Sequence, residues 1–202
     1  MQIALPELNA PATLILDIEN GLSDEKYLRI CRANPDLWLE RTAQGEIVIS
    51  PPVGGDSDYR CLDTGSQLLQ WARKDGRGKA FGSSVQFWLP NGAALSPDAA
   101  WVSNERLGPL TKKQRGEFLR LAPEFVVEVM SPSDRLAAAQ RKMKEWLANG
   151  VELAWLIHGD ARRVYVYRQG REPQLYSGVE TLAGEGPVEG FTLELGEIWE
   201  GL

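Results

Sequence analysis

The sequence predicts an α/β fold in which a mixed β-sheet carries helices on its faces. Strand-like segments alternate with two long segments of helical spacing, in the order β-β-α-β-β-β-α-β-β. The chain has 202 residues, of which 43% are hydrophobic and 25% are charged, as in ordinary globular proteins with one core. It contains no internal repeat and no low-complexity tract, so we expect one domain over residues 1–202.

The N-terminal half should contain a short helix, a hairpin and a long helix. These elements are expected over residues 23–32, 38–42, 46–50 and 57–74. Ser23 is a favoured N-cap residue for the short helix, and period-2 alternation on either side of Gly45 predicts the hairpin. Prolines and glycines make residues 51–55 a loop. Gly76 and Gly78 should end the long helix.

The C-terminal half should supply most of the sheet. Strands are expected over residues 79–89, 99–102, 124–130, 152–157, 162–168 and 174–177. Residues 104–121 are polar and predict an excursion with a little helix. Ser133 can cap a helix that runs to Asn149, where Gly150 supplies a left-handed stop. A looser C-terminus should follow the last strand.

Composition excludes several kinds of active site. The single histidine, His158, is too few for HNH nucleases, HExxH proteases and histidine-rich metal clusters. The two cysteines, Cys31 and Cys61, lack the CxxC spacing of a zinc ribbon, and we expect no disulfide between them. Hydrolytic chemistry must therefore run on carboxylates, lysines and hydroxyls.

Net charge and hydropathy bear on partners and location. The net charge of −6 counts against tight nucleic-acid binding, although magnesium enzymes with acidic active sites can be acidic overall. No apolar run is long enough to span a membrane, and the opening residues lack the basic region of a signal peptide. We therefore expect a cytoplasmic protein without a membrane partner.

Two carboxylates form the strongest candidate site. Asp98 follows a proline and begins one strand, whereas Glu128 lies inside another, very apolar strand. Alternation divides that second strand into two faces, with Val126, Glu128 and Met130 on one and Phe125, Val127 and Val129 on the other. A carboxylate there is costly to ionise unless it is paired or bound to a metal, and hard oxygen ligands favour Mg²⁺ or Mn²⁺. A plain turn at Asp98 and an ion pair at Glu128 are the alternatives.

Other polar residues could join this pair. Asp56 stands at the head of the first long helix, either as a third carboxylate or as an N-cap. Lys142 lies beside the apolar face of the helix after Glu128, where its ammonium could reach a phosphate or an attacking water, or stay solvated. Ser131 and Asp134 could line the site, although helix capping explains Asp134 equally well.

A series of short motifs extends the pattern along the chain. In order they are GGD at 54–56, FGSS at 81–84, LPNG at 89–92, SPDAAWV at 96–102, PEFVVEV at 123–129, SPSD at 131–134, KMKEWLANGV at 142–151 and AWLI at 154–157. Their joint order resembles the Uma family of putative restriction endonucleases, within the PD-(D/E)xK nuclease superfamily. The resemblance covers roughly residues 20–200. It implies a restriction-endonuclease-like core over that range, with a central mixed β-sheet flanked by helices.

The resemblance also implies a chemistry. Mg²⁺, with Mn²⁺ as a substitute, would lie between Asp98 and Glu128, and the carbonyl of Val129 would complete its shell. Asp56 would correspond to the acidic residue at the first long helix. The ion would lower the pKa of a bound water and stabilise the charge that builds on the scissile phosphate.

One residue departs from the family pattern. The motif lysine should stand two residues after Glu128, where this chain has Met130. The leading hypothesis is a Mg²⁺-dependent endonuclease that hydrolyses DNA with a migrated lysine, Lys142, and a homodimer would suit two-fold duplex DNA. The alternatives are a catalytically inactive nuclease-fold module for binding or regulation, and a small domain that self-associates through tryptophans.

Overall fold

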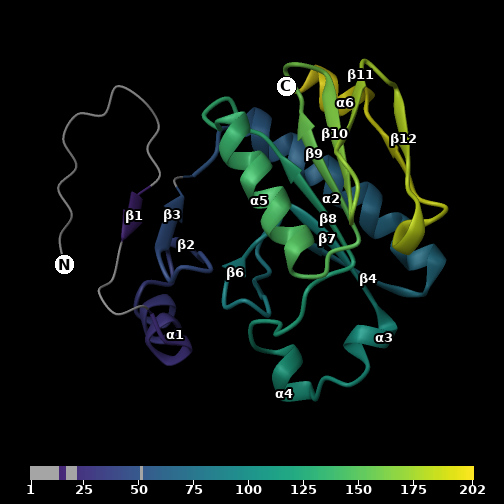
Figure 1. Cartoon of the computed structure of the whole chain (residues 1–202). Helices are drawn as coiled ribbons and strands as arrows, with labels where there is room; N and C mark the ends of the chain where they lie inside the picture. Colours follow the sequence, from purple (N-terminus) through teal and green to yellow (C-terminus); the bar gives the residue numbers. More distant parts are fainter. Residues whose placement is uncertain (1–13, 17–21, 51) are drawn as a thin grey trace.

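A computed structural model describes residues 14–16, 22–50 and 52–202 (Figure 1). Pro51 of the expected loop lies outside these residues, and residues 52–54 lead directly into a helix. None of the helices within the described ranges is long and apolar enough to cross a membrane.

A six-stranded sheet forms the centre of the molecule, in the order β11-β10-β9-β8-β7-β4. Its strands are β4 (Gly78–Gly82), β7 (Ala99–Ser103), β8 (Phe125–Val129), β9 (Leu153–His158), β10 (Arg163–Arg168) and β11 (Gln174–Ser177). β8 and β9 run parallel, whereas the other neighbouring pairs of this sheet are antiparallel. The sheet is therefore mixed, as the sequence predicts.

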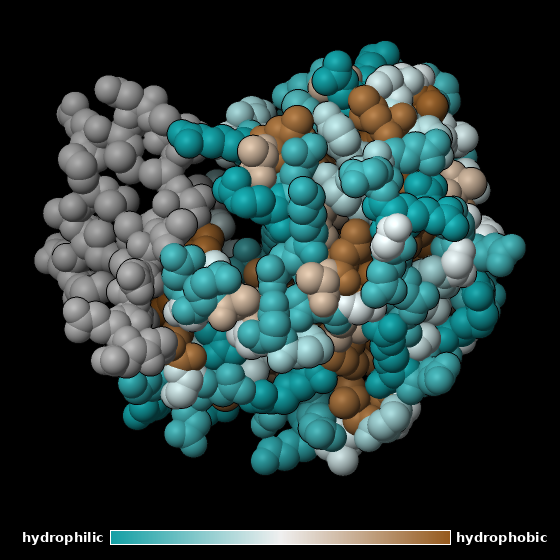
Figure 2. Space-filling view, viewed as in Figure 1, coloured by the Kyte–Doolittle hydropathy of each residue, from teal (hydrophilic) through white to brown (hydrophobic). Residues whose placement is uncertain are grey.

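One long helix covers each face of this central sheet. In Figure 1, α5 (Leu136–Ala148) lies in front of the strands and α2 (Gly55–Asp75) lies behind them. Figure 2 shows the same side of the molecule, where hydrophilic residues dominate and apolar residues appear in separate groups. Apolar residues of both helices pack inward, since Leu68 of α2 lies in one hydrophobic cluster and Met143 of α5 in another, which confirms the α/β class with helices on both faces.

The two faces of β8 are sorted as alternation predicts. Phe125 and Val127 join the hydrophobic cluster that contains Leu68 of α2. Val126 joins the cluster that contains Met143 of α5. Because successive side chains alternate along a strand, Glu128 shares the α5 face with Val126.

A second sheet, which we call the N-terminal sheet, has the order β1-β3-β2-β6-β5. Its strands are β1 (Leu14–Leu16), β2 (Trp38–Arg41), β3 (Ile47–Ser50), β5 (Phe87–Trp88) and β6 (Ala94–Leu95). β2 and β3 form the predicted hairpin, with Gly45 at a positive φ of 85° in its turn. The helix α1 (Asp24–Ala33) packs on this sheet through the buried Tyr27, beside Leu39 of β2.

The helix caps agree with the sequence at three positions and differ at one. The Ser23 hydroxyl accepts a hydrogen bond from the Lys26 N–H at 3.3 Å and caps α1. Gly76, at φ 76°, ends α2, and Gly150 has a φ of 98° after α5. Ser133 was expected to cap α5 and does not, because its hydroxyl bonds to that of Ser131 at 2.7 Å and the helix begins only at Leu136.

Two segments of the chain differ from the expected strands. Residues 79–89 do not form one strand, because a turn closed by Val85 N–H to Gly82 C=O separates β4 from β5, which lies in the other sheet. The expected excursion at 104–121 carries two short helices, α3 (Asn104–Leu107) and α4 (Lys112–Arg115). The C-terminus is not loose. It forms β12 (Thr181–Ala183), a 3-10 turn η1 (Gly186–Val188), β13 (Thr192–Glu194) and α6 (Gly196–Glu200).

The C-terminal elements should contribute strongly to stability. Trp199 of α6 is 5% exposed in the cluster under α2, and its indole N–H donates to the Val179 carbonyl at 2.8 Å. Trp199→Ala should lower the free energy of unfolding by about 3–5 kcal/mol, because it leaves a cavity and an unpaired carbonyl. Urea titration measures the change. Leu175→Ala is the control, since Leu175 is 49% exposed, and equal losses in both variants would contradict the packing of α6.

Candidate active site

Asp98 lies at the junction of two central strands. It directly precedes β7, whose first residue, Ala99, pairs with Val127 of β8. The Asp98 Oδ2 atom accepts a hydrogen bond from the backbone N–H of Val129 at 2.7 Å. The carboxylate is therefore fixed at the end of β8, next to Glu128.

Glu128 projects from β8 toward α5, and it is only 9% exposed. Its Oε1 atom accepts a hydrogen bond from the indole N–H of Trp146 at 2.8 Å. Trp146 is fully buried, so this contact fixes the direction of the carboxylate. The other partner of Glu128 is Lys142, which lies one helical turn before Trp146 on α5.

The Lys142 ammonium contacts three parts of the site at once. Its Nζ atom lies 3.1 Å from both carboxylate oxygens of Glu128 and 3.1 Å from Oε1 of Glu40. It also donates to the backbone carbonyl of Ser96 at 2.9 Å. The helix thus delivers one cation to the loop before Asp98 and to carboxylates from two different sheets.

Glu40 completes this group, although none of the motifs in the sequence marks it as a site residue. It is 9% exposed, and its Oε1 atom also accepts the backbone N–H of Ser96 at 2.7 Å. Leu39 packs in the cluster around α1, so alternation along β2 turns Glu40 to the opposite face of the N-terminal sheet. The signal that could have identified Glu40 is a charged residue inside a predicted strand whose residues alternate between apolar and polar.

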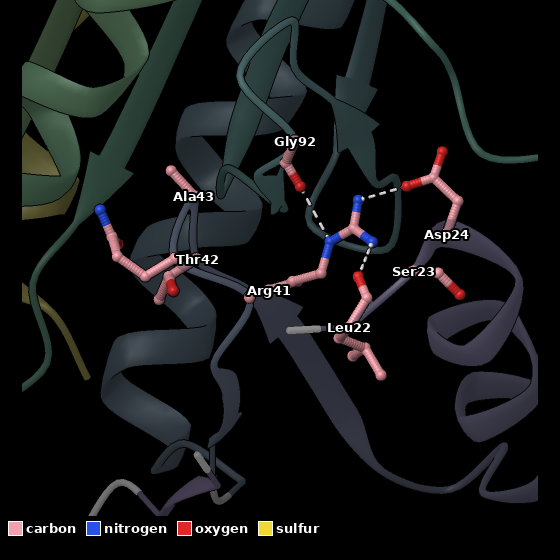
Figure 3. Close-up of a pocket in the computed structure, with 9 residues that line it drawn as sticks. Leu22, Ser23, Asp24, Arg41, Thr42, Ala43 and Gly92 are labelled. Atoms are coloured by element: carbon pink, nitrogen blue, oxygen red, sulfur yellow. Dashed lines mark hydrogen bonds and ion pairs between the residues drawn. The ribbon is translucent and has the colours of Figure 1, made fainter. Parts of the chain in front are cut away.

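Arg41 fixes β2 from the face opposite Glu40. Figure 3 shows its guanidinium beside a small pocket, bonded to the Gly92 carbonyl at 2.8 Å, the Leu22 carbonyl at 3.1 Å and the Asp24 carboxylate at 2.8 Å. Its side chain is only 4% exposed. A buried arginine with this many partners resists displacement, so β2 is held in place where Glu40 meets Lys142.

The site concentrates negative charge in a buried place. Burial, together with the charges of Asp98 and Glu40, raises the pKa of Glu128 to about 8. Burial also raises the pKa of Asp98, to which the charge of Glu40 adds. Burial alone would lower the pKa of Lys142, but Glu128 and Glu40 raise it above its usual value, so the ammonium stays charged.

Cys61 of α2 is a further neighbour of Asp98. Burial raises the pKa of its thiol, and the charge of Asp98 raises it further. The thiol is therefore neutral at pH 7 and donates a weak hydrogen bond to the carboxylate. Both Cys61 and Cys31 are free thiols.

Three residues singled out from the sequence have partners elsewhere. Asp56 is not the N-cap of α2, because that position is taken by Gly54 and Asp56 lies in the first turn of the helix. Its carboxylate contacts Arg60 at 3.2 Å and accepts the Leu202 N–H at 2.8 Å. The Asp134 Oδ2 atom accepts the Ser131 N–H at 2.7 Å and its hydroxyl at 2.9 Å. Ser131 and Asp134 thus stabilise the loop between β8 and α5.

Comparisons with known proteins identify the family of the chain and a similar fold. A family model described as "Uma2: Putative restriction endonuclease" matches residues 24–196. The chain belongs to this family. A crystal structure of a protein described as a putative nuclease from Anabaena variabilis is similar in fold, with a TM-score of 0.69 and 19% identity over 80% of this chain and 89% of that one. No curated protein matches the chain.

Met130, which occupies the position where the resemblance leads us to expect a lysine, belongs to the hydrophobic core. It is 4% exposed in the cluster beneath α5. Within the described ranges, no group of three or more His, Cys, Asp or Glu side chains is arranged to hold a metal ion. The oxygen donors of the site are the carboxylates of Asp98, Glu128 and Glu40 and nearby backbone carbonyls such as that of Ser96.

The raised pKa of Glu128 predicts a pH-dependent stability. Between its ordinary pKa of 4.5 and the folded value of about 8, the folded state binds more protons than the unfolded state, so stability falls as the pH rises through this window. Glu128→Gln removes this titration. Relative to that variant, the metal-free wild type should lose roughly 1–4 kcal/mol of unfolding free energy across the window. Urea titrations at a series of pH values measure it, and parallel curves for the two proteins would contradict it.

Proposed function

We propose that this protein is a Mg²⁺-dependent endonuclease that hydrolyses DNA phosphodiester bonds, with Mn²⁺ able to replace Mg²⁺. The observation that carries the proposal is the position of Lys142. Its ammonium lies 3.1 Å from Glu128, whereas the motif position holds the core residue Met130. A lysine from α5 therefore stands where it can take over the role of the missing motif lysine.

The donor set suits a hard divalent cation. Asp98 and Glu128 offer carboxylate oxygens at the ends of neighbouring strands, and Mg²⁺ prefers oxygen ligands. Burial and mutual repulsion raise the pKa of both acids, and a cation would relieve that repulsion. We propose that the two carboxylates and the Val129 carbonyl hold the ion. When bound, it would supply Lewis-acid activation of a water and of the phosphate.

The chain's own residues would orient the reactants. Lys142 would donate hydrogen bonds to the attacking water or to a phosphate oxygen, which lowers the energy of the charge that develops there. Glu40 and the Ser96 carbonyl would hold the ammonium in position, and Trp146 would aim Glu128. Asp56 has no part in this proposal, because its carboxylate contacts Arg60 and the Leu202 amide.

A catalytically inactive binding or regulatory module is the second candidate. The contacts of Lys142 favour this candidate. All three N–H donors of its ammonium face partners within the protein, namely Ser96, Glu128 and Glu40, so none is free for a substrate. An active state must exchange one of these contacts for water or phosphate. The homodimer and the single domain expected from the sequence stay predictions.

Asp98→Ala should abolish both metal binding and cleavage. Losing one of two carboxylate ligands should slow the Mg²⁺-supported nicking of plasmid DNA by at least about 100-fold. Gel electrophoresis measures the rate, and calorimetry measures Mn²⁺ affinity. Glu172→Ala removes an exposed acid and serves as the control. Equal nicking by Asp98→Ala and the wild type would overturn the proposal.

Lys142→Met should separate catalysis from metal binding. The nicking rate should fall by at least about 100-fold, because no ammonium remains at the site, whereas Mn²⁺ affinity should be kept. Lys144→Met is the matched control, since Lys144 is exposed on the same helix. A wild-type rate in Lys142→Met would show that Lys142 does not replace the motif lysine.

A further inference from the structure

Trp38 is an unusually exposed aromatic residue in this molecule. It is 44% exposed, whereas the other six tryptophans are buried or half-buried. Within the described part of the chain it belongs to none of the three hydrophobic clusters. A large aromatic surface left in water needs an explanation in binding more often than a single exposed aliphatic residue does.

The position of Trp38 on β2 connects it to the active site. Residues two apart on a strand share a face, so Trp38 lies on the same face of the N-terminal sheet as Glu40, about 7 Å further along. Glu40 contacts Lys142 on that face. Trp38 is therefore beside the candidate catalytic group and not on the α1 side of the sheet.

The neighbours of Trp38 leave its ring open. Its cross-strand partner on β3 is Ser50, whose side chain is too small to cover an indole. Further along the same face, the pair Glu40 and Val48 follows. With 44% of its surface exposed, Trp38 offers accessible aromatic surface on the face of β2 that also carries Glu40.

On the face of β2 that carries Glu40, the N-terminal sheet meets α5 through Lys142. Arg41, at the other end of β2, bonds to the Gly92 carbonyl, and the adjacent Asn91 N–H donates to the Asn149 side chain at the C-terminal end of α5. Trp38 lies at the opposite end of β2 from these contacts. Arg135, directly before α5, and Arg141, in the middle of α5, are exposed cations, and such side chains neutralise phosphates.

We propose that Trp38 stacks on an unpaired base of the strand being cleaved, so that the preferred substrate is single-stranded or locally unpaired nucleic acid. This inference rests on the proposed function and names its substrate class. An open aromatic ring beside cationic side chains is how proteins bind unpaired bases without reading their sequence. In a duplex the bases are already stacked on one another, and exposing one costs unstacking energy.

Binding without cleavage tests the inference. In EDTA, fluorescence anisotropy measures the Kd for a labelled oligothymidylate and for a hairpin duplex of mixed sequence. Trp38→Ala should weaken oligothymidylate binding by roughly 5- to 100-fold, because a stacking contact is lost. Trp38→Phe should keep most of the affinity, and duplex binding should change little in either variant. Leu175→Ala, which removes an exposed side chain on β11, is the control and should bind like the wild type.

Several results would overturn the inference. Unchanged oligothymidylate binding in Trp38→Ala would do so, and so would equal losses for oligothymidylate and duplex. A change of oligomeric state in Trp38→Ala, measured by light scattering, would assign the exposed ring to a protein interface instead. A selective loss of oligothymidylate binding supports stacking even if the wild type fails to nick DNA, so the two proposals can fail separately. A wild type that binds neither oligonucleotide would overturn this inference, whereas the nicking assay with Mg²⁺ tests the proposed function.

Discussion

One ammonium group among three carboxylates governs the candidate active site. Lys142 contacts Glu128 and Glu40, and Asp98 lies beside Glu128, so the ionised group carries an excess of negative charge in a buried place. Buried charge of one sign is expensive unless a counter-charge is near. The raised pKa values of Asp98 and Glu128 express that cost. A divalent cation would offset that charge, which is why we propose metal-dependent nuclease chemistry for this group.

The fold holds these charges together from four elements. β8 presents Glu128, the segment before β7 presents Asp98, β2 presents Glu40, and α5 presents Lys142. Each support is itself buried: Trp146 orients Glu128, and Arg41 anchors β2 behind Glu40. The N-terminal sheet consequently contributes to the candidate active site through Glu40, and the exposed Trp38 lies two residues before Glu40 on the same strand.

Local sequence patterns predicted the central sheet and the residues that it carries. Alternation in β8 placed Glu128 on the same strand face as Val126 and Met130, and helical spacing placed Lys142 beside the core, because both patterns depend only on neighbours along the chain. Glu40 was missed because its role depends on the packing of two sheets that local spacing does not encode. The split of residues 79–89 and the ordered C-terminus were missed for the same reason. Their burial comes from contacts with α2 and the second sheet that are distant in sequence.

The most direct measurement is the anomalous scattering of a crystal soaked in Mn²⁺. A metal site built by Asp98, Glu128 and the Val129 carbonyl predicts an anomalous peak between residues 98 and 128, with the Lys142 ammonium beside it. A peak at another location in a crystal of active protein, with none between these two carboxylates, would contradict it.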